Sequence, residues 1–190
     1  MSERQDTLTK YVSDMLTVTK HIHEAIERQR NDAEVKQDQD AYPIINRLDG
    51  ILESQINALE SHLTSIGGDT GSPIKEAVGS VLGVFAGLLD KVRTDTVSKM
   101  LRDDYTALSL QAIALTMLHT TGLALKQPET AALALSQLHD ITPVIVDISE
   151  IIPLVVVREL ANDSETIDMR VGDTAIQNTQ KAWSRDVTEV

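Results

Sequence analysis

The sequence predicts an all-α protein: a four-helix bundle with a fifth, glycine-striped helix in the long crossover between the second and third bundle helices. Aromatic residues make up only 3% of the 190 residues, whereas Ala, Leu, Ile and Val are plentiful. That bias favours helices packed through aliphatic side chains over a β-sandwich. Apolar residues recur at helical spacing along four long segments, and three glycines recur at every fourth position of a shorter one.

Two of the long segments lie in the first part of the chain. An apolar stripe with Thr19 inside it predicts a helix from about residue 5 to 34, followed by a solvated polar connection. Pro43 suits the first turn of a second helix, which Gly67 and Gly68 end. The two stripes consist of Leu8, Val12, Met15, Ile22 and Ile26, and of Ile45, Leu48, Leu52, Leu59 and Ile66.

The segment that follows carries the glycines. Residues 77–89 are uncharged and contain Gly79, Gly83 and Gly87 on one helical side, although glycine destabilises an exposed helix by about 1 kcal/mol relative to alanine. Close packing against another helix, within the bundle or in a dimer, explains the glycines. Membrane association is the alternative. The segment is shorter than the roughly 20 apolar residues of a membrane span, which favours packing.

The third and fourth bundle helices follow. Thr94 is a candidate cap for a helix ending near Leu125, and Pro128 opens a helix reaching about Leu160. Kinks are expected at Pro143 and Pro153 within that last helix. The sequence thus divides into a bundle, residues 1–161, and a polar tail, 162–190, in which Asp173 could cap a short helix presenting Ile176 and Trp183.

The lengths of these segments predict their connectivity. Helices of roughly 26 to 33 residues would each be about 40–50 Å long. Short links join the first helix to the second and the third to the fourth, whereas nearly thirty residues separate the middle pair. One long central crossover is the ferritin-like topology.

Charge and composition narrow the classes of partner. The formal net charge is −12, and the densest basic run is interleaved with aspartates, so nucleic-acid binding is not expected. The sequence contains no cysteine. The polar N-terminus lacks a secretory signal, and Asp147 and Glu150 interrupt the longest apolar run. A cytoplasmic protein that does not enter a membrane is expected.

The ferritin-like topology makes metal binding a candidate function. A ferritin-like di-iron site uses carboxylates and a repeated Glu-x-x-His pattern, because iron binds carboxylate oxygens and imidazoles. None of the five histidines has a glutamate three residues before it. The remaining candidate metal ligands are Glu60, His62, Asp103, His139, Asp147 and Glu150. The alternatives are a hydrogen-bonded core histidine at position 62 and ion pairs to Arg93, Lys99 or Arg102 for the acidic residues on the last helix.

Four stretches resemble the bacterial ferritin-like stress proteins of the YciF type. These are DMLTVTKHIHEAI (14–26), INALESHLTSIGG (56–68), LRDDYTALSLQAIALTML (101–118) and LALSQLHDITP (133–143). The resemblance places the family's first-helix glutamate at Thr19 and its last acidic pair at His139 and Asp140. Where the family has glutamates flanking a tyrosine, Asp103 precedes Tyr105 and Thr106 follows it. The second helix offers Gln55 and His62 as its polar residues.

Two functions follow from these observations. The first is a ferritin-like bundle with an incomplete di-iron site that acts as a stress-related structural or interaction module, as a homo-oligomer. The alternative is a di-iron or di-manganese oxidoreductase, or a peroxide-detoxifying protein, with an unusual ligand set. Whether the protein is an enzyme therefore stays open. The C-terminal tail either docks onto a protein partner through Ile176 and Trp183 or stays unbound.

Overall fold

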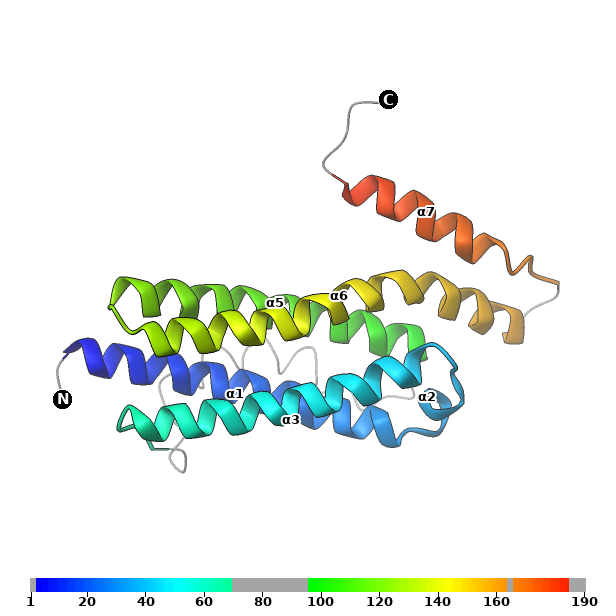
Figure 1. Cartoon of the computed structure of the whole chain (residues 1–190). Coiled ribbons are helices and arrows are strands. Elements are labelled where there is room, and N and C mark those ends of the chain that lie inside the picture. The colour runs from blue at the N-terminus through cyan, green and yellow to red at the C-terminus, as the bar shows by residue number, and fades with distance from the viewer. Residues whose placement is uncertain (1–2, 70–95, 164–165, 185–190) are drawn as a thin grey trace.

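The computed structural model describes residues 3–69, 96–163 and 166–184, and every regular element in these ranges is a helix (Figure 1). The all-α prediction is confirmed for the described chain. The predicted glycine-striped helix at 77–89 lies outside the described residues. The helices are α1 (Glu3–Asn31), α2 (Ala33–Gln37), α3 (Ala41–Ser65), α5 (Val97–Ala124), α6 (Pro128–Asp163) and α7 (Val171–Trp183).

The four long helices pack in a ring: α1 contacts α3 and α5, and α6 contacts the same two helices (Figure 1). Side-chain contacts give their directions. His62, near the end of α3, meets Thr130 at the start of α6, whereas Asp40, just before α3, meets Arg158 near the end of α6. Helices α3 and α6 are therefore antiparallel.

The same test applies to α1 and α5. Gln29 of α1 contacts Asp104 early in α5, whereas Thr19 contacts Gln111, about two turns further along α5. Helix α1 is thus antiparallel to α5, and Gln5 bonds to the Ile66 carbonyl beyond the end of α3, so α1 is antiparallel to α3 as well. Helices α3 and α5 run parallel, so the end of α3 and the start of α5 lie at opposite ends of the ring.

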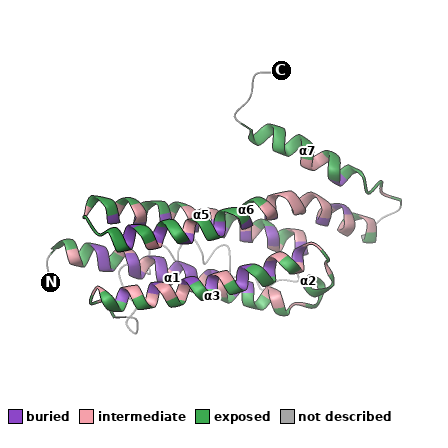
Figure 2. Ribbon diagram, viewed as in Figure 1, coloured by how far each residue is buried: buried purple, intermediate pink, exposed green. Residues whose placement is uncertain are grey.

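Aliphatic side chains from all four helices fill the space inside the ring, and the buried surfaces face inward in Figure 2. The apolar stripes predicted for the first two helices supply much of this core. Each fully buried aliphatic side chain contributes about 1.5–3 kcal/mol. The largest fully buried side chains are Leu8, Ile22, Ile26, Ile45, Leu48, Leu52, Leu59, Leu63, Leu101, Leu108 and Leu115.

The connection after α1 differs from the solvated link that the sequence predicts, because it contains the short helix α2. The side chain of Asp32 accepts hydrogen bonds from the backbone N–H groups of Glu34 and Val35. Val35 is buried against the core. Residues 31–40 are mostly polar, so the sequence does not predict this short helix. Asp32 caps its start and Val35 packs it against the core.

The C-terminal end of α6 holds the starts of two other helices. Arg158 bonds to the carboxylates of Asp38 and Asp40 at 2.6–2.9 Å. Glu159 accepts from the backbone N–H of Ser98 at 2.8 Å and from its hydroxyl at 2.5 Å. A carboxylate at this position satisfies a free N–H group of α5 and interacts favourably with the helix dipole. The N-terminus of α5 is thus capped from α6.

The tail contains helix α7, which packs on α6 and is mostly exposed (Figures 1 and 2). Helix α7 starts at Val171, two residues before Asp173, which the sequence suggests as its cap. Arg170 precedes the helix, and its side chain makes no capping hydrogen bond. Gly172 lies close to Leu154, since an added Cβ would be 2.9 Å from the Leu154 side chain. The ring centroids of Trp183 and Tyr105 are 5.7 Å apart.

Candidate functional site: a buried amide layer

A layer of uncharged polar side chains crosses the middle of the bundle. It consists of Thr19 from α1, Gln55 from α3, Gln111 from α5 and Gln137 from α6. All four residues are at most 2% exposed. Burying a hydroxyl or an amide is unfavourable unless it forms hydrogen bonds, so the bonds of this layer decide whether it is stable.

The four side chains bond to one another and to the backbone. The Thr19 hydroxyl donates to the Met15 carbonyl at 2.9 Å, so it is available as an acceptor. The Gln111 amide nitrogen donates both of its protons, to Thr19 Oγ1 at 3.2 Å and to Gln55 Oε1 at 3.0 Å. Gln55 and Gln137 each donate to the other's backbone carbonyl, at 3.0 and 3.1 Å. The bonds connect all four long helices.

Two acceptors in the layer remain unused. No described residue donates to Oε1 of Gln111 or to Oε1 of Gln137, and both atoms are buried. A buried polar atom without a partner lowers stability by about 1–3 kcal/mol. The layer therefore offers neutral carbonyl oxygens and no negative charge.

A second polar contact joins α1 to α5 nearer the end of the bundle. Gln29 Nε2 donates to Asp104 Oδ1 at 2.8 Å, and Asp104 is 4% exposed. Burial raises the pKa of Asp104 to about 7. The Gln29 hydrogen bond opposes this shift, and the negative charge of Asp103 adds to it. Within the described chain, Asp104 Oδ2 and Gln29 Oε1 accept no hydrogen bond.

Three of the predicted metal ligands have other partners nearby. Glu60 pairs with Lys20 at 2.6 Å. His62 shares a hydrogen bond of 2.8 Å with Thr130, and burial lowers its pKa while the charge of Glu129 acts in the opposite direction. Asp103 pairs with the adjacent Arg102 at 2.7 Å.

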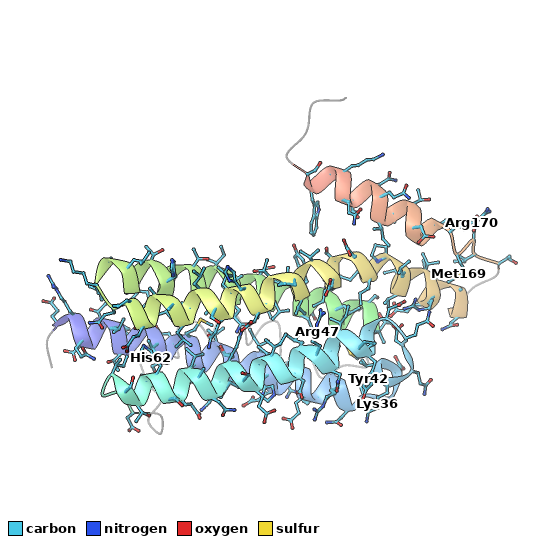
Figure 3. All side chains as sticks on the ribbon, viewed as in Figure 1. Lys36, Tyr42, Arg47, His62, Met169 and Arg170 are labelled. Atoms are coloured by element: carbon cyan, nitrogen blue, oxygen red, sulfur yellow. The ribbon has the colours of Figure 1, made fainter. Side chains whose placement is uncertain are left out.

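The three candidates on α6 also lie apart. His139 is exposed. Asp147 forms an ion pair with Arg47 of α3, which is not among the three basic residues proposed from the sequence. Glu150 accepts a hydrogen bond of 2.9 Å from Gln180 of α7. Figure 3 shows Arg47 and His62 at well-separated positions along α3, so their partners are separated too.

A di-iron centre does not fit the middle of this bundle. Within residues 3–69, 96–163 and 166–184, no group of three or more histidine, aspartate and glutamate side chains could hold a metal ion. The amide layer supplies neutral oxygens, whereas a di-iron site uses bridging carboxylates and imidazoles. No metal-dependent step is assigned to these residues.

Sequence reasoning identified Thr19 and Gln55 as uncharged residues on apolar stripes but missed Gln111, Gln137 and Asp104. A signal for two of them existed in α5, whose buried positions include Leu101, Asp104, Leu108, Gln111 and Leu115. Spacings of three and four residues put the two polar side chains on the core face. For Gln137 the corresponding signal is its spacing from Ala134 and Ile141 on α6, both of which are buried.

Helix α5 is the one described helix that is long and apolar enough to cross a membrane, with a mean hydropathy of 1.3 over its most apolar window. A core helix of a soluble protein passes the same test, so this property is weak evidence for a membrane span. Comparison of the chain with protein-family models, with curated proteins and with solved structures found no match.

Proposed function

We propose that this protein is a ferritin-like helical bundle that serves as a structural or interaction module and does not use a di-iron centre. The observation that carries the proposal is the amide layer, in which neutral side chains from all four long helices bond to one another and to the backbone inside the bundle. The parallel arrangement of α3 and α5 supports the ferritin-like part, because it requires one long central crossover.

The amide layer has a structural role that suits such a module. Sliding one helix past another by a turn would separate Gln111 from Gln55 and leave several amide groups buried without partners, each at a cost of about 1–3 kcal/mol. Buried polar residues set helix register in this way in coiled coils. We therefore assign the layer to alignment of the four helices.

The test is metal analysis of the full chain, purified without chelators from cells supplied with iron and manganese. We expect far less than one metal ion per chain. A matched variant, His139→Ala with Glu150→Ala, should have the same metal content, since the proposal gives neither residue a ligand role. Stoichiometric iron or manganese in the natural chain would refute the proposal and favour the oxidoreductase. Loss of that metal in the variant would assign its ligands to α6.

The proposal also covers the cellular location and the partners of the protein. Resemblance to bacterial stress proteins supports a cytoplasmic, stress-related role, and the net charge of −12 supports protein partners over nucleic acids. Homo-oligomer formation and docking of a protein partner on the C-terminal tail belong to the same proposal.

A further inference from the structure

A cavity of about 260 Å³, here called the α7 cavity, lies where α7 packs on the α5–α6 pair. Figure 1 shows α7 beside these two helices. On α7 the cavity is lined by Ile176, Thr179, Gln180 and Trp183. Their spacing of three and four residues places all four on one side of the helix. Helix α7 therefore forms the outer wall of the cavity.

Helix α7 is held near both of its ends. Near its start, Gly172 lies so close to Leu154 of α6 that an added Cβ would be 2.9 Å from the Leu154 side chain. At its last residue, the ring of Trp183 lies 5.7 Å from the ring of Tyr105 of α5, with an angle of 49° between the ring planes. The helix is thus fixed over α5 and α6 at two points, and it spans the cavity instead of filling it.

The wall of the α7 cavity is mostly apolar. Tyr105 of α5 lines it together with Ile152 and Pro153 of α6, opposite Ile176 and Trp183 of α7. Trp183 is the only tryptophan in the sequence, and it is 63% exposed. An apolar cavity of about 150 Å³ holds benzene, so this cavity has room for a substituted aromatic ring.

The polar side chains in the wall already have partners. Gln180 donates to Glu150 at 2.9 Å, and Arg102 pairs with Asp103 at 2.7 Å. Since Arg102 and Glu150 carry opposite charges and both line the cavity, the wall has no net charge to attract an ion. Three hydroxyl groups in the wall donate to backbone carbonyls of their own helices at 2.7–3.0 Å, those of Thr106, Ser149 and Thr179. These pairings favour an uncharged ligand.

Pro153 adds one hydrogen-bond acceptor to the wall. Proline has no backbone N–H, so the carbonyl of Ser149 cannot accept the usual helical bond from residue 153. Ser149 and Pro153 both line the cavity, so this carbonyl lies on the cavity side of α6. A carbonyl covered by an apolar ligand is stable only if it accepts a hydrogen bond. The wall therefore suits a ligand with one donor.

We propose that the α7 cavity binds a small, uncharged aromatic molecule that carries one hydrogen-bond donor, as a phenol does. The donor bonds to the Ser149 carbonyl, and the ring packs between Ile152 of α6 and Ile176 of α7. Trp183 and Tyr105 contact the ring at a tilt, which is a favourable arrangement for aromatic groups. The proposal goes beyond the interaction module, because it depends neither on the amide layer nor on the metal content of the bundle.

The first test uses Trp183 as a reporter, because it is the only tryptophan and it lines the cavity. Titration of the full chain with phenol should change tryptophan fluorescence in a saturable way, and calorimetry should give the same dissociation constant. Toluene has the same ring without a donor, so it should bind at least about fivefold more weakly. The absence of saturable binding of phenol, or equally tight binding of toluene, would overturn the proposal.

The second test fills the cavity. Thr106→Phe puts a ring into the wall and should weaken phenol binding roughly tenfold or more. The matched control is Thr116→Phe on the same helix. Both threonines are exposed, and both donate to the carbonyl four residues earlier, but only Thr106 lines the cavity. Unchanged phenol affinity in Thr106→Phe, with the variant shown to be folded by circular dichroism, would contradict binding at this site.

The third test concerns the acceptor. Pro153→Ala supplies the missing N–H to the Ser149 carbonyl, so the preference for phenol over toluene should fall from about fivefold to nearly none. Pro143→Ala changes the other proline inside α6, which does not line the cavity, and should leave the preference unchanged. A preference that persists in Pro153→Ala would show that the ligand's donor bonds elsewhere and would overturn the assignment of Ser149.

Discussion

The interface between α1 and α5 contains two buried polar contacts of different kinds. In the amide layer, Gln111 bonds to Thr19 and to Gln55, and every group is neutral at any physiological pH. Nearer the end of the bundle, Gln29 bonds to Asp104, whose pKa burial raises to about 7. The two contacts join the same helices, yet only the second can gain a charge near neutral pH.

The difference shows which conditions allow a polar group to be buried inside a bundle. Amides satisfy their donors within the layer and align four helices without ionising. An aspartate in a similar position gains one hydrogen bond but loses hydration of its charge, so its protonated form is favoured in the folded state. We therefore expect the free energy of unfolding to change when a side chain of the layer is truncated, and the contribution of the Asp104 contact to change with pH.

The largest effect is expected from Gln55→Ala. Truncation removes the hydrogen bond that the Gln55 amide donates to the Gln137 carbonyl and the one that its Oε1 accepts from Gln111, and it opens a cavity. The bond from the Gln137 amide to the Gln55 backbone carbonyl remains possible. We expect the free energy of unfolding to fall by about 4 kcal/mol. Urea denaturation at pH 7 measures the change. Ser61→Ala on the exposed surface of the same helix is the control, and an equal loss there would contradict the role of the layer.

A smaller effect is expected from Asp104→Asn. The folded-state pKa of Asp104 is raised from 3.8 to about 7, so its contribution to stability is fully present below pH 4 and is lost as the pH rises to about 7. The neutral amide cannot ionise, and it can donate to the unused Gln29 Oε1. The variant should be more stable than the natural chain at pH 8, on the order of 2–3 kcal/mol.

Denaturation of both proteins from pH 4 to pH 9 measures this prediction. The stability difference should grow between pH 4 and pH 7 and then level off. Asp140→Asn is the control, since Asp140 is exposed on α6. A difference between Asp104→Asn and the natural chain that does not vary with pH would show that Asp104 ionises normally.

The next effect is smaller again, and it separates the stability of the fold from the specificity of its helix register. Replacing the whole layer, by Thr19→Val together with leucine at positions 55, 111 and 137, removes both donors and acceptors. Such replacements are neutral or stabilising, here by about 1–2 kcal/mol, because no partner is left unsatisfied. The two-dimensional amide NMR spectrum should become broader as helix register is lost. A destabilised variant with sharp resonances would contradict the alignment role.

The smallest effect is expected at the surface. Lys20 and Glu60 lie 2.6 Å apart, but their side chains are 41% and 36% exposed. Lys20→Ala should change the free energy of unfolding by less than about 0.5 kcal/mol, because solvent screens such pairs. Thermal unfolding in low and high salt measures it. A loss comparable to that of Gln55→Ala would mean that this pair, and not the amide layer, aligns α1 with α3.

Much of the fold could be predicted from local patterns. The apolar stripe through Leu8 and Ile26 and the proline at position 128 located α1 and the start of α6 within a few residues. The end of α6 was placed near Leu160 but lies at Asp163, and α2 was missed. Helix ends depend on a few capping groups, some of which come from elsewhere, as Glu159 does for α5.

The candidate site was less predictable. Glu60, His62 and Glu150 were grouped because acidic and histidine residues share metal chemistry, but a sequence does not show which side chains meet. In the structure their partners are Lys20, Thr130 and Gln180, which are remote in sequence.

The sequence by itself determined that this chain is helical, because the spacing of aliphatic residues is a local property of three to four positions. It also determined that the protein is strongly acidic and that the helix ending near Leu125 carries no Asp, Glu, Lys or Arg after Asp104. Only the tertiary structure decided that Gln55, Gln111 and Gln137 share one layer and that Asp104 is buried. Those facts depend on the register between helices, which long-range packing sets and no local pattern encodes.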